Sequence, residues 1–173
     1  RAFARIQAQA PEAQLVVAGD GSERATLEAL VAELRLSNVT FTGRVPHERM
    51  SALYEAADIY LNSPDIDNMP SSVIEAYAAG IPVVTTDAGG IPYILRHEAT
   101  GMLVPCGDDA AMATAALRLL QEPALAQRIS TQARAELEAR YVWPAVRDAW
   151  LDLYARMVAA HGAGAASHHA GAA

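Results

Sequence analysis

Residues 63–92 read SPDIDNMPSSVIEAYAAGIPVVTTDAGGIP, and this stretch decides the fold. Ser71–Ala79 carries apolar residues at three- and four-residue spacing, which predicts a helix packed on a sheet. Gly80 follows as a helix-end signal. Residues 83–85 form a short β-branched run typical of a buried strand. A helix followed directly by such a strand is one unit of an α/β fold.

The same alternation continues on both sides of this stretch. Short apolar runs joined by longer amphipathic segments predict parallel strands connected by crossover helices. The sequence therefore predicts a three-layer α/β/α, Rossmann-like fold with a parallel sheet. The other expected strands cover residues 14–18, 39–42, 59–62 and 102–104, and the other expected helices of this part cover 23–36 and 48–57.

The two ends of the chain differ from this pattern. Phe3 and Ile6 stand at helical spacing, which predicts the tail of a helix whose start lies upstream. After Pro105 the chain is expected to be helical throughout, over residues 110–120, 124–140 and 145–160. Residues 162–173 are rich in Gly and Ala without an apolar period, which predicts a disordered tail. We expect one domain over residues 1–161, truncated at its N-terminus.

The composition narrows the function classes. The 173 residues carry a formal net charge of -7, whereas recognition of nucleic-acid phosphates needs clustered Lys and Arg. We therefore expect no nucleic-acid partner. No apolar run approaches the roughly 18 residues of a membrane span, and the lone Cys106 cannot form an internal disulfide. These features predict a soluble, cytoplasmic protein.

Two glycine-rich turns follow the first two expected strands. In an open parallel sheet, ligands bind beyond the carboxyl ends of the strands, so these turns are candidate binding loops. Glycine lets the backbone approach a ligand, and a following helix start offers free N–H groups to a phosphate. Taken alone, the first turn is better explained as a tight structural turn, whereas for the second turn the structural and functional interpretations are about even. The candidate residues are Gly19, Asp20 and Gly21 in the first turn and Gly43, Arg44 and Val45 in the second.

The third candidate loop leads into the helix at Ser71–Ala79. The backbone N–H groups near its start can bind an anion, helped by the helix dipole. Glu75 lies one turn inside the helix, where its carboxylate can accept hydrogen bonds from two neighbouring ribose hydroxyls. Asp67 can accept bonds from a donor sugar. A helix cap at Asp67 or Ser71 and a solvated Glu75 are the structural alternative. The loop residues are Asn68, Met69, Pro70, Ser71 and Ser72.

These residues resemble the signature of the retaining GT-B glycosyltransferases of family 4, also called group 1. That family carries a Glu-x7-Glu motif followed by E-A, a small residue, G-x-P-V-V and a paired glycine. The similarity extends to VVAGDG, VTFTGRV, LYEAADIYLNSP and TGMLVPCGD and runs from about Gln14 to Tyr154. The matching motif residues are Asp67, Glu75, Ala76, Gly80, Pro82, Val83, Val84, Gly89 and Gly90.

The resemblance implies the C-terminal, donor-binding domain of such an enzyme, lacking its first strand. Asp67 and Glu75 would be its catalytic acids, with Glu75 on the ribose and Asp67 on the transferred sugar. The two glycine turns would line the phosphates and the base. The family's first acid is usually Glu, and Asp67 is shorter by roughly 1.5 Å. The basic pair that binds the diphosphate would lie upstream of Arg1.

The resemblance also implies the reaction and the partners. The donor would be a UDP-, GDP- or ADP-sugar, the acceptor half of the enzyme would be a missing N-terminal domain, and no metal or other cofactor is expected. Peripheral membrane docking of the whole enzyme stays open. A nucleotide-sugar epimerase of the same fold and a non-catalytic scaffold are the alternatives. A receiver-like regulatory module fits poorly, because Asp20 lacks neighbouring carboxylates.

Overall fold

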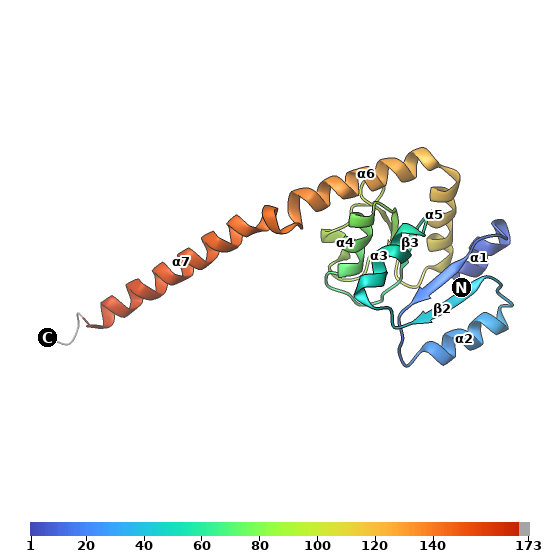
Figure 1. The fold of residues 1–173 in the computed structure, drawn as a ribbon, viewed down its shortest axis with the longest axis horizontal. Coiled ribbons are helices and arrows are strands. Elements are labelled where there is room, and N and C mark those ends of the chain that lie inside the picture. Colours follow the sequence, from blue (N-terminus) through green and yellow to red (C-terminus); the bar gives the residue numbers. More distant parts are fainter. Residues whose placement is uncertain (170–173) are drawn as a thin grey trace. The chain divides into compact units, whose positions relative to one another are not determined.

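The computed structural model describes residues 1–169, with side chains up to Ala159. It divides into two compact units, Arg1–Arg134 and Ala135–Ala173. The first unit holds the strands and most of the helices, and the last helix belongs to the second (Figure 1). The predicted domain boundary at residue 161 stays a prediction.

The strands of the first unit are parallel and form two sheets. The first sheet pairs β1 with β2, with Leu15 opposite Val39. The second has the order β3-β4-β5, with Tyr60 opposite Val83 and Val84 opposite Met102. All five lie where the sequence predicts strands, with ends that differ by at most one residue. Their bounds are β1 Leu15–Ala18, β2 Val39–Gly43, β3 Tyr60–Asn62, β4 Val83–Thr86 and β5 Met102–Val104.

The division into two sheets corrects the expectation of one continuous sheet. Among the described strands, β1 pairs only with β2, and β3 only with β4. Within each sheet the strands are parallel, as the sequence predicts.

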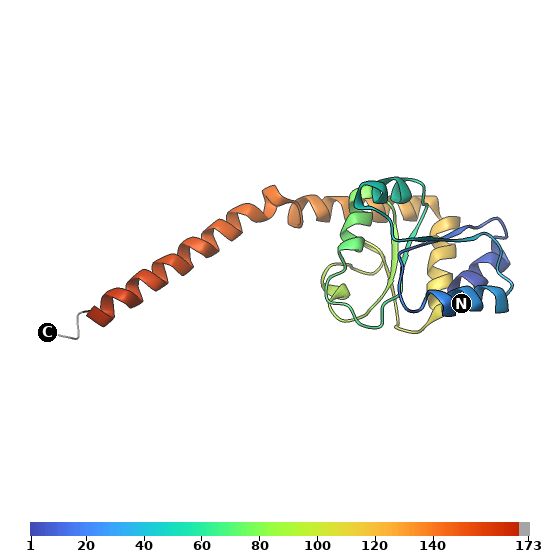
Figure 2. The ribbon, with the colours of Figure 1, turned by 60° about the horizontal axis from the view of Figure 1, so that its bottom comes forward.

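Helices cover the strands of the second sheet on two sides. In Figures 1 and 2, α4 and α5 lie on opposite sides of this sheet, which gives three layers. Helix α3 contacts α4, and α1 contacts α5. The helices are α1 Ala2–Gln9, α2 Arg24–Glu33, α3 His47–Glu55, α4 Ser71–Ala79, α5 Asp109–Gln121 and α6 Pro123–Arg140, with a short 3-10 turn at Ile91–Tyr93.

The main core lies between the strands and the helices α1, α5 and α6. Phe3 and Ile6 of α1 are buried in it, as their helical spacing predicts. An ion pair between Arg5 and Asp109, 2.6 Å long, joins α1 to α5 at the surface. The rest of the buried cluster is Val84, Met102, Val104, Met112, Ala113, Ala115, Ala116, Leu117, Leu119, Leu125 and Ile129.

Helix ends agree with the sequence signals in part. Gly80 ends α4 with a φ of 75°, a left-handed conformation that suits glycine. The Asp108 side chain caps α5 by accepting the N–H of Ala111 at 2.8 Å. Ser22 is a residue type that often caps helices, but it does not cap α2: that helix begins after Glu23 and has no side-chain cap. A backbone bond from Arg24 N–H to Gly21 O shapes the turn instead.

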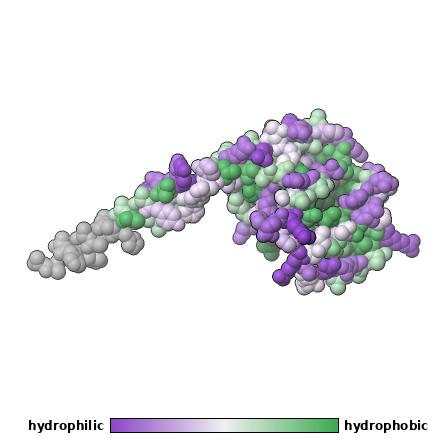
Figure 3. All heavy atoms as spheres, in the orientation of Figure 1, coloured by the Kyte–Doolittle hydropathy of each residue, from purple (hydrophilic) through white to green (hydrophobic). Residues whose placement is uncertain are grey.

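The second unit contains the end of α6 and the helix α7 Trp143–His169. This helix runs past residue 160, the expected end, into the segment predicted to be a disordered tail. Alanine has the highest helix propensity, so an Ala-rich segment without an apolar period can still be helical. Residues 170–173 of the predicted tail lie outside the described residues. Both green and purple residues lie on the described part of α7 (Figure 3). Trp150 and Tyr154 of this helix are exposed.

Two neighbouring leucines of α5 test the position of the core. Leu119 is 3% exposed and Leu120 is 42% exposed. We expect Leu119→Ala to lower the free energy of unfolding by about 2–5 kcal/mol, because it leaves a cavity in the core. Leu120→Ala removes the same atoms from a partly solvated position and should cost far less. Urea denaturation followed by circular dichroism measures both, and equal losses would contradict this placement of α5.

Candidate functional site

The two glycine turns predicted from separate segments lie side by side. Gly19 follows β1 and Gly43 ends β2, and the N–H of Gly19 donates to the carbonyl of Gly43 at 3.0 Å. Both have a positive φ, 127° and 67°, a backbone conformation that residues with a side chain rarely adopt. Because β1 and β2 are parallel, their carboxyl ends share one edge of the first sheet. The turns therefore present adjoining backbone at that edge.

The side chains around these turns are exposed but partly engaged. Asp20 accepts the N–H of Gly21 at 3.0 Å, which shapes the first turn. The Arg24 guanidinium lies next to Gly43, but it is bonded to Glu28 at 2.8 Å. The Arg24 side chain therefore lies beside the second turn, but its positive charge is already paired with the Glu28 carboxylate. Arg44 is exposed and Val45 is half-buried.

The N-terminus of α4 has no side-chain cap. The capping position is Pro70, with φ -65° and ψ 117°, and neither Asp67 nor Ser71 bonds to the helix start. The N–H of Val73 donates to the carbonyl of Pro70 at 3.2 Å. The capping alternative raised by the sequence is therefore wrong. Among the described residues, the N–H groups of Ser71 and Ser72 receive no side-chain partner, so this end of the helix can accept an anion.

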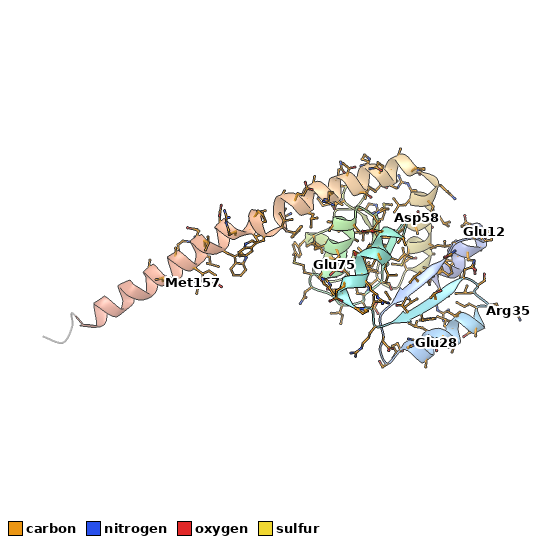
Figure 4. All side chains as sticks on the ribbon, viewed as in Figure 1. Glu12, Glu28, Arg35, Asp58, Glu75 and Met157 are labelled. Carbon is orange, nitrogen blue, oxygen red and sulfur yellow. The ribbon has the colours of Figure 1, made fainter. Side chains whose placement is uncertain are left out.

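Glu75 is half-buried on α4 and bonded to α3 rather than freely solvated. Its Oε2 accepts the hydroxyl of Tyr54 at 3.1 Å, and in Figure 4 it lies where α4 meets α3. Tyr54 is buried, and its ring meets that of Tyr60 edge to face at 5.7 Å. Burial, then Tyr60 and Glu75, raise the pKa of the Tyr54 hydroxyl above its usual range. The hydroxyl therefore stays a donor to the carboxylate even well above neutral pH.

The paired glycines hold the loop that carries Asp67 and Asn68. The N–H of Gly90 donates to the carbonyl of Asp67 at 2.9 Å. A Cβ atom at Gly89 would lie 2.0 Å from the Asp67 carbonyl oxygen, and one at Gly90 would lie 1.8 Å from that of Asn68. No side chain fits in such space. The two backbones therefore pack directly on each other, and the loop position depends on both glycines.

The same loop is anchored at its start by the last residue of β4 and by residues that follow β4 and β5. The hydroxyl of Thr86 donates to the carbonyl of Pro64 at 2.5 Å. Cys106 is an exposed loop thiol whose N–H donates to Asp87 at 3.2 Å and whose Sγ lies 3.8 Å from Pro64 O. Desolvation by its neighbours, then Asp87, raise the pKa of this thiol. The thiol lies within hydrogen-bonding distance of Pro64 O and of Asp87 Oδ1, the latter at 3.6 Å.

The predicted site residues thus form three local groups. Gly19 pairs with Gly43, the loop at Asp67 packs on Gly89 and Gly90, and Glu75 bonds to Tyr54. No hydrogen bond between described residues joins the first group to the other two. Asp67 is half-buried, Pro70 is buried, and Asn68, Met69 and Ser71 are exposed around the helix start.

Sequence reasoning missed Tyr54, Thr86 and Asp87. Tyr54 stands within the segment LYEAADIYLNSP, which resembles the family, but its helical spacing indicated only a residue packed on the sheet. Thr86 and Asp87 follow a predicted strand at its carboxyl end, which is a usable signal for a loop contact. Their partners could not be read from the sequence, because they lie about 20 residues away.

Two further features bear on function. Within the described part of the chain, no three His, Cys, Asp or Glu side chains gather as a metal site would require. Across the same residues, no helix combines the length and apolar character needed to cross a membrane.

Comparison with known families and sequences gives consistent matches. The family described as "Glycosyl transferases group 1" matches residues 1–136. The lipopolysaccharide core biosynthesis glycosyltransferase LpsD of Rhizobium meliloti is 35% identical over 146 residues, which cover 84% of this chain and 42% of that protein. The N-acetyl-alpha-D-glucosaminyl L-malate synthase of Bacillus anthracis is 32% identical over 78% of this chain and 35% of its own length. The chain therefore spans less than half of these relatives.

Solved structures show the same fold. Sucrose-phosphate synthase from Thermosynechococcus elongatus superposes with a TM-score of 0.83 at 33% identity, over 92% of this chain and 42% of that one. HepE of Anabaena, in complex with UDP-glucose, superposes with a TM-score of 0.79 at 21% identity, over 89% and 44%. The α/β fold with parallel strands is thus confirmed.

The contact between the paired glycines and the Asp67 loop gives a prediction. Gly90 has an ordinary φ of -89°, so Gly90→Ala acts only through the clash with the backbone of Asn68. We expect it to displace the loop and to lower the melting temperature by several degrees. Gly107→Ala is the control, because its φ of 74° strains the backbone but no atom lies within 4 Å. Faster amide exchange over residues 65–69 in Gly90→Ala alone is the expected signature, and equal exchange in both variants would contradict it.

Proposed function

This chain belongs to the group 1 glycosyl transferases, and from that membership we propose that it binds the nucleoside diphosphate sugar of an enzyme that transfers the sugar to an acceptor hydroxyl. The observation that carries the proposal is the uncapped start of α4 with Glu75 one turn inside it. A helix end left without a cap costs stability, and an anionic ligand would supply the missing partner.

The diphosphate is proposed to bind at the N-terminus of α4. The free N–H groups of Ser71 and Ser72 and the helix dipole attract negative charge there. As the sugar leaves, charge grows on the diphosphate, and a preorganised helix end stabilises it without reorganisation. Asp67, whose backbone the paired glycines fix, accepts hydrogen bonds from the transferred sugar. We propose that this chemistry needs no metal: the helix N-terminus stabilises part of the charge, and the basic pair that the resemblance implies would stabilise the rest.

Glu75 is proposed to bind the ribose. Its carboxylate accepts one hydrogen bond from Tyr54, and its remaining lone pairs can accept the two ribose hydroxyls. The turn of Gly19 and Gly21 borders the phosphates, and the backbone from Gly43 to Val45 borders the base. These turns lie together in the fold, which supports a shared ligand.

The donor class follows from the relatives only in part. HepE of Anabaena is described in complex with UDP-glucose, and a pneumococcal O-GlcNAc transferase in complex with UDP and GlcNAc. We propose a UDP-sugar as the first donor to test, with GDP- and ADP-sugars as alternatives. We further propose that the acceptor is bound by another half of the enzyme, that the anomeric configuration is retained, and that the protein works in the cytoplasm, where a lone thiol such as Cys106 stays reduced.

Nucleotide binding by this chain tests the proposal directly. In titrations with UDP-glucose, GDP-mannose and ADP-glucose, followed by nuclear magnetic resonance, we expect one base to bind best and to shift the amides of Ser71 and Ser72. Glu75→Ala should weaken that binding roughly tenfold to hundredfold, because hydrogen bonds to a charged group are lost. Glu55→Ala removes an exposed carboxylate beside Tyr54 and should change little. Absence of any shift at α4, or equal effects of the two variants, would count against the site.

Catalysis requires an enzyme that contains this domain together with an acceptor-binding half. There Asp67→Ala should lower kcat by about 100-fold, because a contact with the reacting sugar is lost. Asp67→Glu should keep activity, since Glu is the usual residue in the family. The anomeric configuration of the product, read from its proton coupling constants, should match that of the donor. Full activity in Asp67→Ala, or conversion of the donor to its epimer without transfer, would contradict the proposed reaction.

A further inference from the structure

The bond between Tyr54 and Glu75 fixes a side chain that the ligand needs. Tyr54 is 7% exposed, and its hydroxyl lies 3.1 Å from Glu75 Oε2 and 3.3 Å from the carbonyl of Ser72. The hydroxyl has one proton, and a carboxylate is a stronger acceptor than a neutral carbonyl. The proton therefore goes to Glu75. No described residue donates a hydrogen bond to the other carboxylate oxygen, Oε1.

The tyrosine itself is held rigidly. Its ring packs edge to face against Tyr60 at an interplanar angle of 64°. Helix α3, which carries it, contacts α4, which carries Glu75. Burial raises the pKa of the Tyr54 hydroxyl, so it stays a donor well into the alkaline range. A rigid donor that bonds to one oxygen restricts the rotamers of the glutamate, so that Oε1 is presented in one direction.

We propose that Tyr54 is a positioning residue that orders Glu75 before the ligand arrives and thereby sets the preference for ribose over deoxyribose. The inference rests on the proposed function, in which Glu75 accepts the ribose hydroxyls. A free glutamate side chain loses rotamer freedom when it binds, and this loss weakens the interaction. When Tyr54 holds Glu75, the glutamate loses this rotamer freedom during folding, so ligand binding no longer has to restrict it. The benefit applies only to ligands that carry the hydroxyl that Glu75 binds.

The test compares nucleotides that differ in one hydroxyl. Dissociation constants are measured for uridine diphosphate and its 2′-deoxy and 3′-deoxy forms, or for the base that binds best. The unsubstituted chain should prefer the ribonucleotide. Tyr54→Phe, which keeps the ring packed on Tyr60, should weaken ribonucleotide binding roughly threefold to tenfold. Its affinity for the deoxy form that lacks the Glu75-bound hydroxyl should stay nearly constant.

A matched control uses the same chemical change elsewhere on the fold. Tyr77 is fully buried on α4, two residues beyond Glu75 and so on about the opposite face of the helix. Its hydroxyl bonds to Ile94 O and Thr100 Oγ1. Tyr77→Phe should lower stability and leave the ribose preference unchanged. In a Glu75→Ala background, Tyr54→Phe should have no further effect on the preference, because Tyr54 acts through the carboxylate.

A measurement without nucleotide tests the contact by itself. The hydroxyl proton of Tyr54 should resonate downfield in the unsubstituted chain and move upfield in Glu75→Ala. Equal losses for ribo- and deoxynucleotides in Tyr54→Phe would overturn the positioning role and indicate a structural one. An unchanged hydroxyl resonance in Glu75→Ala would overturn the contact. If the unsubstituted chain shows the downfield proton but does not prefer ribose, the proposed function fails, and the ribose role of Tyr54 is rejected with it.

Discussion

The arrangement of the site depends on one close approach between two stretches of backbone. The carbonyls of Asp67 and Asn68 lie where side chains at Gly89 and Gly90 would have to be. This contact ties the loop before α4 to the loop after β4, and the bond from Gly90 to Asp67 fixes its register. Because β4 is fully buried, the residues that follow it are held in place by the core, and they in turn hold the loop. The start of α4 is therefore held in place without a capping side chain.

An uncapped helix start on a rigid support has a physical consequence. Replacing a good N-cap typically costs about 1 kcal/mol of stability, and neither neighbouring polar residue, Asp67 or Ser71, acts as one here. The Asp67 side chain is thereby left available to a ligand, and the N–H groups stay free. In the proposed function, this stability is lost where the diphosphate needs unpaired N–H donors. The bond between Tyr54 and Glu75 has the opposite effect: it orders the Glu75 carboxylate during folding, before the proposed ligand binds.

The sequence predicts those features that depend on local pattern. Five strands and α4 follow from apolar spacing, and Gly80 ends α4 because its backbone conformation suits glycine. The adjacency of Gly19 and Gly43 follows from parallel strands. Features that depend on partners far along the chain are not readable in this way. The spacing of Tyr54 indicates burial but not the bond to Glu75. Ser22 has the residue type of a cap, but the turn before α2 is formed by the backbone bond from Arg24 N–H to Gly21 O.

The same rigidity bears on the one departure from the family motif. Asp67 is shorter than glutamate by about 1.5 Å. A mobile loop could move toward the ligand to restore the contact. Here the carbonyls on both sides of the Asp67–Asn68 peptide are packed against glycines, and Pro64 is bonded to Thr86, so the backbone has little room to shift. Under the proposed role of Asp67, the missing reach would fall to the ligand side: the sugar would sit closer to the loop, or a water would bridge the carboxylate to its hydroxyls. Either arrangement would change which sugar hydroxyls Asp67 distinguishes, so in that role the shorter side chain bears on donor choice more than on folding.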